Sequence, residues 1–377
     1  MNKIGLKDLD DIALGATFLG TGGGGDPYIA TLMTRKAIEQ NGSVPMLPLD
    51  EVPDNALIFA CGNMGAPTVA IEKIMGADQP PAAVRALEAH LGRQADLLMA
   101  FEAGGSNSMM PIYNAAILGK PIVDADGMGR AFPEMQMVTF SVYGASGSPF
   151  ALASEHGDTV ILDIDDDHRA EYIGRGITIR MGARAAKASY PMDGVTARRV
   201  SIPGTTSLCQ AIGVNLRESR EQISDPFTNL IEMLSETHYE HAKVLYSGRV
   251  TDLIRETRDG WAIGKVVISG RDDENLEIEF QNEFLAARQG NQLRAIVPDL
   301  ICILDSEMAQ PITTERLRYG QRVSVMAVSA PPIMRTNEAL AVFGPAGFGM
   351  ESTFIPCLLY TSPSPRDLST SRMPSSA

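Results

Sequence analysis

The 377 residues of the chain are enough for two average domains. Its 44% hydrophobic and 21% charged residues are ordinary for a globular protein with a sizeable core. The formal net charge of −14 argues against nucleic-acid and anionic-membrane partners, because both require a basic surface.

The first half of the chain alternates expected helices with expected strands. Apolar residues recur at helical spacing over 6–19, and Pro27 behind Asp26 indicates a second helix that continues to about residue 40. The elements expected after it are strands at 44–49, 56–60, 95–101 and 121–123 and helices at 80–92 and 109–118. Because strands and helices alternate, we expect a mostly parallel sheet with helices on its faces.

After about residue 150 the pattern changes to serial strands. We expect strands at 159–164, 246–255, 261–269, 276–280, 293–304 and 322–328, with helices at 205–223 and 226–241. We therefore predict an α/β fold class with two domains: an N-terminal α/β domain over 1–165, and a β-rich, barrel-like domain with helices over 166–356.

The end of the chain has a different composition. Residues 357–377 read CLLYTSPSPRD, LST and SRMPSSA, and the first and last strings match in-frame translations of a sequencing-library adapter with its index between them. A natural disordered tail rich in serine and proline is the alternative. We interpret 357–377 as adapter sequence and leave it out of the expected fold.

The glycine-rich turn at 20–26 is the first candidate site. It formally contains GxGxxG, and consecutive glycines let the backbone approach a ligand and expose N–H groups. A dinucleotide site would need a strand before the turn, whereas the residues before it are predicted to be helical. A purely structural turn is the other alternative. The residues expected to contact a small ligand are Gly22, Gly23, Gly24 and Asp26.

A second candidate is the polar loop at 102–107, which follows an expected strand and precedes a helix. Ligands of open α/β sheets bind at the carboxyl ends of strands, so Glu102 and Asn107 can present a carboxylate and an amide. The alternative is that Asn107 or Ser106 caps the helix and that Glu102 is a solvated loop charge.

The third candidate is the segment 124–134, DADGMGRAFPE, which carries three carboxylates and one arginine. Arg130 could orient a carbonyl or carboxylate by paired hydrogen bonds. Asp124, Asp126 or Glu134 could act as a general base or as oxygen ligands of a metal. An internal arginine–carboxylate network that fixes the loop is the alternative. We take these four residues as the candidate catalytic set and expect the glycine turn to form the opposite wall of the site.

Other features exclude classes of protein. Charged residues follow the N-terminus closely and no apolar run reaches roughly 18 residues, so we expect a cytoplasmic protein with no membrane partner. The sequence contains no GxSxG elbow of a serine hydrolase. The cysteines stand singly, which is typical of reduced, buried thiols: Cys61, Cys209, Cys302 and Cys357.

The strings LGTGGGGDPY and DADGMGRAFPE, with the 102–107 loop between them, resemble a bacterial and archaeal family named for S-methyl thiohydantoin desulfurase. The resemblance extends over 1–356 and includes GPAGFG at 344–349. It implies an α/β domain followed by a β-rich domain, and chemistry on a hydantoin or its thio-analogue. Members often accompany hydantoin-utilisation proteins. The resemblance brings no established catalytic residues, so the site prediction rests on the motifs.

We therefore expect an enzyme that cleaves or desulfurises a hydantoin-like ring. Arg130 would hold a ring carbonyl, and Asp124, Asp126 or Glu134 would activate water, with room for a divalent metal. The rival is a non-catalytic ligand-binding or accessory subunit of a hydantoinase-type system. Besides the small-molecule substrate, a second copy of the chain or hydantoinase-type subunits are the expected partners. A nucleotide-dependent enzyme is a third alternative.

Overall fold

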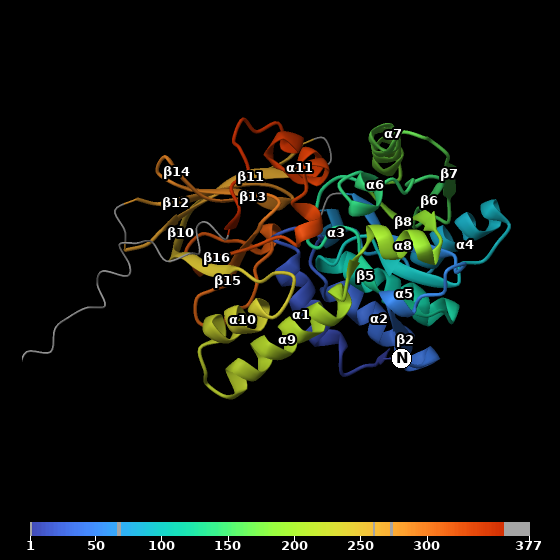
Figure 1. Ribbon diagram of the computed structural model, residues 1–377, viewed down its shortest axis with the longest axis horizontal. Helices are drawn as coiled ribbons and strands as arrows, with labels where there is room; N and C mark the ends of the chain where they lie inside the picture. The colour runs from blue at the N-terminus through green and yellow to red at the C-terminus, as the bar shows by residue number, and fades with distance from the viewer. Residues whose placement is uncertain (1, 66–68, 259–260, 272–273, 358–377) are drawn as a thin grey trace, which may run out of the picture.

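A computed structural model describes residues 2–65, 69–258, 261–271 and 274–357 (Figure 1). Two sheets lie side by side in it, and helices accompany mainly the first. We call the first sheet with its helices the α/β domain and the second sheet the β-rich domain. None of the described helices is long and apolar enough to cross a membrane.

Four parallel strands form the centre of the first sheet. Their order is β2 (Val44–Pro48), β5 (Ile122–Asp126), β4 (Leu97–Ala100) and β3 (Ile58–Gly65). Every residue of β4 and β5 is buried, as expected for parallel strands that are covered on both faces. Helix α2 (Tyr28–Asn41) precedes β2, and the helices that connect the later strands are α3 (Val69–Glu72), α4 (Gln79–Leu91) and α5 (Met109–Leu118). The predicted α/β domain is confirmed.

Antiparallel strands extend this sheet on both sides. They are β1 (Asn2–Ile4) beside β2; β8 (Arg184–Met192), β6 (Phe150–Ala153) and β7 (Thr159–Leu162) beyond β3; and β9 (Ile202–Pro203) at the end of β5. We did not expect β8, which pairs with β3 over most of the length of both strands. Residues beyond position 165 thus complete the first sheet.

Helix α1 (Leu9–Leu19) precedes the glycine turn directly. It packs against α9 (Thr205–Glu221) so closely that a Cβ on Gly15 would lie 1.8 Å from the carbonyl oxygen of Cys209. The Nε of Arg217 also donates to Oδ1 of Asp11 at 3.0 Å. Helix and not strand precedes Gly20, so the turn lacks the strand–turn–helix arrangement that the nucleotide-dependent alternative requires. The other helices are α6 (Thr139–Val142), α7 (Asp167–Arg180), α8 (Gly194–Val200), α10 (Pro226–Ser235) and α11 (Asn337–Phe343).

The second sheet is antiparallel throughout and curls into a half-barrel, which confirms the β-rich domain. Its order is β14 (Gln292–Ile296), β13 (Glu283–Gln289), β12 (Leu276–Gln281), β11 (Trp261–Ser269), β10 (Ala242–Arg258), β16 (Arg322–Val328) and β15 (Leu300–Asp305). The single strand expected at 293–304 is two strands, because Pro298 lacks an N–H group and cannot continue the ladder.

The last described residues pack against the body of the protein. Cys357 is buried, and its N–H group donates to the carboxylate of Asp299. All four cysteines are free and buried, as expected. Cys357 is the first residue of the predicted adapter segment, and the remainder, 358–377, lies outside the described residues.

Candidate functional site

The glycine turn is where the two domains meet. The carbonyl oxygen of Gly22 accepts hydrogen bonds from the N–H and hydroxyl groups of Thr314, at 2.9 and 3.0 Å. A Cβ on Gly22 would lie 2.5 Å from the ring of Phe284, and a Cβ on Gly23 would lie 1.9 Å from Oε1 of Glu283. Strand β13 can therefore approach the turn only because these residues lack side chains.

Asp26, at the end of the turn, joins the domains by charge. Its carboxylate pairs with Arg316 of the β-rich domain, and its Oδ1 accepts the N–H of Tyr28 at 2.9 Å. Helix α2 begins at Tyr28, so Pro27 precedes the first helical residue instead of occupying it. Asp26 thus stabilises the start of α2 and the domain contact.

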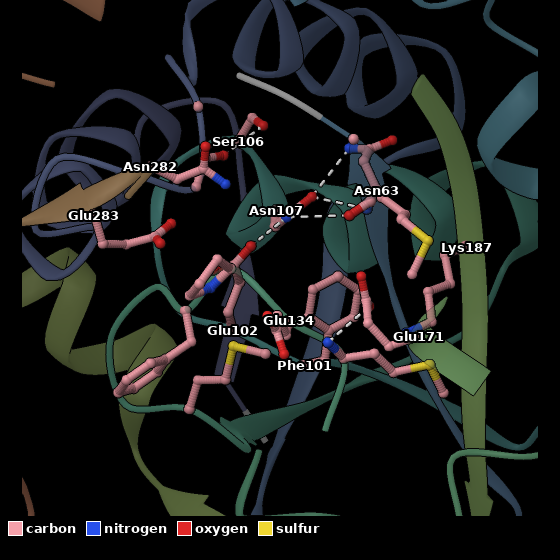
Figure 2. Close-up of a pocket in the computed structure, with 18 of the residues that line it drawn as sticks. Asn63, Phe101, Glu102, Ser106, Asn107, Glu134, Glu171, Lys187, Asn282 and Glu283 are labelled. Carbon is pink, nitrogen blue, oxygen red and sulfur yellow. Dashed lines mark hydrogen bonds between the residues drawn. The ribbon is translucent and has the colours of Figure 1, made fainter. Parts of the chain in front are cut away.

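A cavity of about 70 Å³ opens beside the turn, at the carboxyl ends of β3 and β4 (Figure 2). This volume is several times the roughly 10–15 Å³ that one water needs. The turn, the segments 101–107 and 128–135, α7, β8 and the start of β13 all contribute to its lining. The predicted residues that line it are Gly24, Glu102, Asn107 and Glu134. The turn and the 124–134 segment therefore share one cavity, whereas Gly22, Gly23 and Asp26 lie outside its lining.

Glu102 and Asn107 form a buried hydrogen-bonded unit with Asn63 from the end of β3 (Figure 2). Oδ1 of Asn107 accepts the backbone N–H of Asn63 at 2.8 Å and its side-chain amide at 3.1 Å. Nδ2 of Asn107 donates to Oε1 of Glu102. Since Glu102 is 3% exposed and α5 has no side-chain cap, the alternative of a helix cap and a solvated charge is wrong.

Glu283 is a second buried carboxyl group in the cavity, and sequence reasoning missed it. Burial raises the pKa of Glu283 to about 8, while burial and the nearby charges of Glu283 and Asp126 raise the pKa of Glu102 well above its ordinary value. Neither Oε2 of Glu102 nor Oε2 of Glu283 has a hydrogen-bond partner within the described residues. Two carboxyl groups that favour their neutral forms therefore each leave one oxygen unpaired.

The raised pKa of Glu283 predicts an unusual pH dependence of stability. The folded protein holds the carboxyl proton of Glu283 more tightly than the unfolded chain does. The contribution of this proton to the unfolding free energy is therefore complete below pH 4.5 and is lost as pH rises to about 8. In that window each pH unit lowers the unfolding free energy of the wild type by up to about 1.4 kcal/mol relative to Glu283→Gln, which does not titrate. Urea denaturation of both proteins at pH 5, 6.5 and 8 measures the difference. Parallel pH profiles would show that Glu283 titrates normally.

Glu134 lies on the cavity wall and is half-buried. Its carboxylate accepts a hydrogen bond from the side-chain amide of Gln136. Burial, more than the nearby charge of Glu171, raises the pKa of Glu134. Of the four predicted catalytic residues, Glu134 alone lines the cavity.

The two aspartates of the predicted set fix the backbone. Asp124 accepts hydrogen bonds from the N–H and hydroxyl groups of Ser207, at 3.0 and 2.5 Å, at the start of α9. Oδ2 of Asp126 accepts the N–H groups of Ala103 at 2.7 Å and Gly129 at 2.8 Å. Asp126 is fully buried, which raises its pKa to about 7.

Arg130 is fully buried and joins the 124–134 segment to the β-rich domain. It donates to the carbonyl oxygens of Asp299 at 2.9 Å, Phe284 at 3.0 Å and Ala131 at 3.2 Å. The alternative of an arginine–carboxylate network is therefore wrong as a pairing: the hydrogen bonds of Arg130 go to carbonyl oxygens, and those of Asp124 and Asp126 come from backbone N–H groups and Ser207. The three side chains do fix the loop, as that alternative supposed. Their catalytic roles stay a prediction.

Three cations that line the cavity were also absent from the predicted site residues. They belong to α7 and β8, two elements that the sequence pattern did not predict. Arg175 pairs with Glu171 and lies 3.8 Å from the centre of the Trp261 ring in the β-rich domain. Lys187 lies over the ring of Phe101, and burial lowers its pKa to about 8. Arg184 is the third. In the described part of the chain, no three His, Cys, Asp or Glu side chains are placed to hold a metal ion.

Two family models match the chain. The S-Me-THD-like N-terminal domain matches residues 7–164 and the S-Me-THD-like C-terminal domain matches residues 165–357. A crystal structure of a protein from Chromobacterium violaceum is similar, with a TM-score of 0.81 and 24% sequence identity over 94% of this chain and 100% of that chain. This likeness shows the fold. A search of curated proteins finds no match.

Proposed function

Because the chain belongs to the S-Me-THD-like family, we propose that it is an enzyme that hydrolyses a small cyclic amide of the hydantoin or thiohydantoin type. The family is the one that the glycine turn and the 124–134 string resemble. The observation that carries the proposal is the cavity, where Glu102 and Glu283 each have an unpaired buried oxygen. A five-membered cyclic imide offers N–H donors beside carbonyl or thiocarbonyl acceptors, which suits such a pair of groups.

The proposed chemistry is addition of water to a ring carbon. Glu134 takes a proton from the water, and Glu102, which its surroundings keep protonated, gives a proton to the departing atom. With a thiohydantoin the carbon–sulfur bond breaks, so that thiohydantoin and water give hydantoin and hydrogen sulfide. With an S-methyl derivative methanethiol leaves instead, and with a hydantoin a ring carbon–nitrogen bond breaks.

A turnover screen tests the proposal. The purified protein is incubated with hydantoin, 2-thiohydantoin and S-methyl-2-thiohydantoin, and released sulfide, methanethiol and ring-opened product are measured. We expect turnover of at least one of these rings and a loss of at least about 10² in rate in Glu102→Gln, which keeps the hydrogen bond from Asn107 but cannot donate an acidic proton. Binding without turnover would favour the accessory-subunit alternative.

A further inference from the structure

Asn107 is a buried amide whose orientation in the cavity wall is fixed by its partners (Figure 2). Its carboxamide oxygen Oδ1 accepts the backbone N–H group of Asn63 at 2.8 Å, and a backbone N–H group can only donate. The side-chain amide of Asn63 donates to the same oxygen at 3.1 Å. The other end of the Asn107 side chain is therefore the NH₂ group, and this group donates to Oε1 of Glu102.

This hydrogen bond makes the two oxygens of the Glu102 carboxyl group different. Oε1 accepts from Asn107, whereas Oε2 has no partner in the part of the chain that the structure describes. Burial raises the pKa of Glu102 and favours its neutral form, which carries one proton on one of the two oxygens. Because the carbonyl oxygen of a neutral carboxyl group is the better acceptor, the N–H donor at Oε1 favours the proton on Oε2. The proton thus belongs to the oxygen that still needs a partner.

The glycine turn holds Asn107 in place through the residue before it. The N–H group of Ser106 donates to the carbonyl oxygens of Gly24 and Gly25, both at 2.9 Å. The hydroxyl group of Ser106 also donates to the carbonyl oxygen of Gly24, at 2.9 Å. A Cβ on Gly24 would lie 2.5 Å from the carbonyl oxygen of Gly104, so the turn can approach this loop only because Gly24 lacks a side chain. The turn therefore fixes the backbone from which the Asn107 side chain extends.

We propose that Asn107 is a positioning residue, which holds the acid proton of Glu102 on Oε2 and so presents it to the departing atom of the substrate. The proposal rests on the proposed function and gives Asn107 a part in it that needs no contact with the ligand. In the transfer the Oε2–H bond breaks, the departing atom gains the proton and Glu102 becomes a carboxylate. The proton that Glu134 takes from water then returns through solvent to Glu102, which restores both groups.

Asn107→Leu replaces the amide by an apolar group of similar shape, and its effect is measured with and without the acid. We expect Asn107→Leu to lower kcat at least about tenfold in the wild-type background. In the Glu102→Gln background, where no acid proton is left to position, the same change should lower kcat by less than about twofold. A residue that only stabilises the fold would lower kcat by the same factor in both backgrounds, and that result would overturn the inference.

Asn107→Asp keeps the size of the side chain and an acceptor for Asn63, so it tests the inference even if Asn107→Leu does not fold. Its carboxyl group shares one proton with Glu102, and Oε2 regains a proton of its own only when the pair binds a second one at lower pH. The kcat of Asn107→Asp relative to the wild type should therefore rise as pH falls from about 8 to about 5. A ratio that does not change with pH would contradict the proposed role.

The other charged groups that act on Glu102 are the same in both proteins, so their effects cancel in this ratio: Glu283 on β13, Asp126 on β5 and Lys187 on β8. The matched control is Asn291→Asp, which makes the same change at an exposed position between β13 and β14. Its kcat should equal that of the wild type at every pH.

Infrared spectroscopy locates the proton without any turnover. The C=O band of neutral Glu102 is the band that Glu102→Gln removes from the wild-type spectrum. A hydrogen bond donated to a carbonyl oxygen weakens the C=O bond, so the band should move to higher frequency in Asn107→Leu. Turnover of a ring together with an unmoved band would overturn the inference and leave the proposed function standing. A moved band without turnover of any ring would support the proton on Oε2 and overturn the proposed function.

Discussion

Replacing Glu134 with glutamine is expected to lower kcat by about 10²–10⁴, the contribution of a well-placed general base. Glutamine preserves the size of the side chain and an acceptor for the hydrogen bond from Gln136, but it cannot take a proton from water. Because burial raises the pKa of Glu134, its carboxylate is a stronger base than an exposed glutamate. kcat and KM are measured with whichever ring the wild type turns over.

The matched control is Glu218→Gln, which makes the same change on the exposed face of α9 and should leave kcat unchanged. Urea denaturation of both variants separates a chemical effect from a folding effect, and we expect both midpoints to stay close to that of the wild type. Turnover of Glu134→Gln near the wild-type rate would remove Glu134 from the mechanism. A loss of activity matched by a loss of stability would assign Glu134 a structural role.

Periodic segments were predicted well because their pattern is local. The helix at 109–118 and the strands at 261–269 and 322–328 have the predicted bounds. In β12 the buried Leu276 and Ile278 alternate with the exposed Glu277 and Glu279, which is the period of a half-buried strand. Strand β8 was missed for the opposite reason, since its buried Arg184 and Lys187 interrupt the apolar pattern.

Sequence order predicts a site residue of this fold most readily when the residue follows a strand of the parallel sheet. Glu102 and Asn107 follow β4, and the carboxyl ends of parallel strands are where ligands bind, so sequence order placed them in the cavity. Glu283 reaches the same cavity because β13 packs against the side-chain-free Gly22 and Gly23, and no local pattern in β13 predicts that contact.

The role of a carboxylate in a glycine-rich loop is ambiguous in the sequence for a related reason. Asp126 and Glu134 stand in one segment, yet one accepts backbone N–H groups and the other faces a cavity. The difference depends on where the backbone N–H groups of Ala103 and Gly129 point, which composition does not specify. A carboxylate that fixes a loop and one that acts on a ligand can therefore look alike in sequence.

Arg130→Met is expected to lower the unfolding free energy by about 3–5 kcal/mol, because it removes a buried charged donor and leaves its partners in place. Methionine fills a similar length, but the carbonyl oxygens of Phe284 and Asp299 stay buried without the donor that joins the two domains. Chemical denaturation at an unchanged m-value measures the loss. Arg322→Met, which removes an exposed guanidinium, should change stability by no more than about 0.5 kcal/mol.

The same variant decides between two roles for Arg130. The guanidinium charge lowers the pKa of Glu283, so its removal should raise that pKa above about 8 and extend the pH-dependent loss of stability to higher pH. A structural Arg130 thus predicts a less stable protein with a shifted pH profile. If Arg130→Met instead unfolds like the wild type and no longer binds hydantoin-type rings, then Arg130 contacts the ligand, as its place in the DADGMGRAFPE segment first indicated.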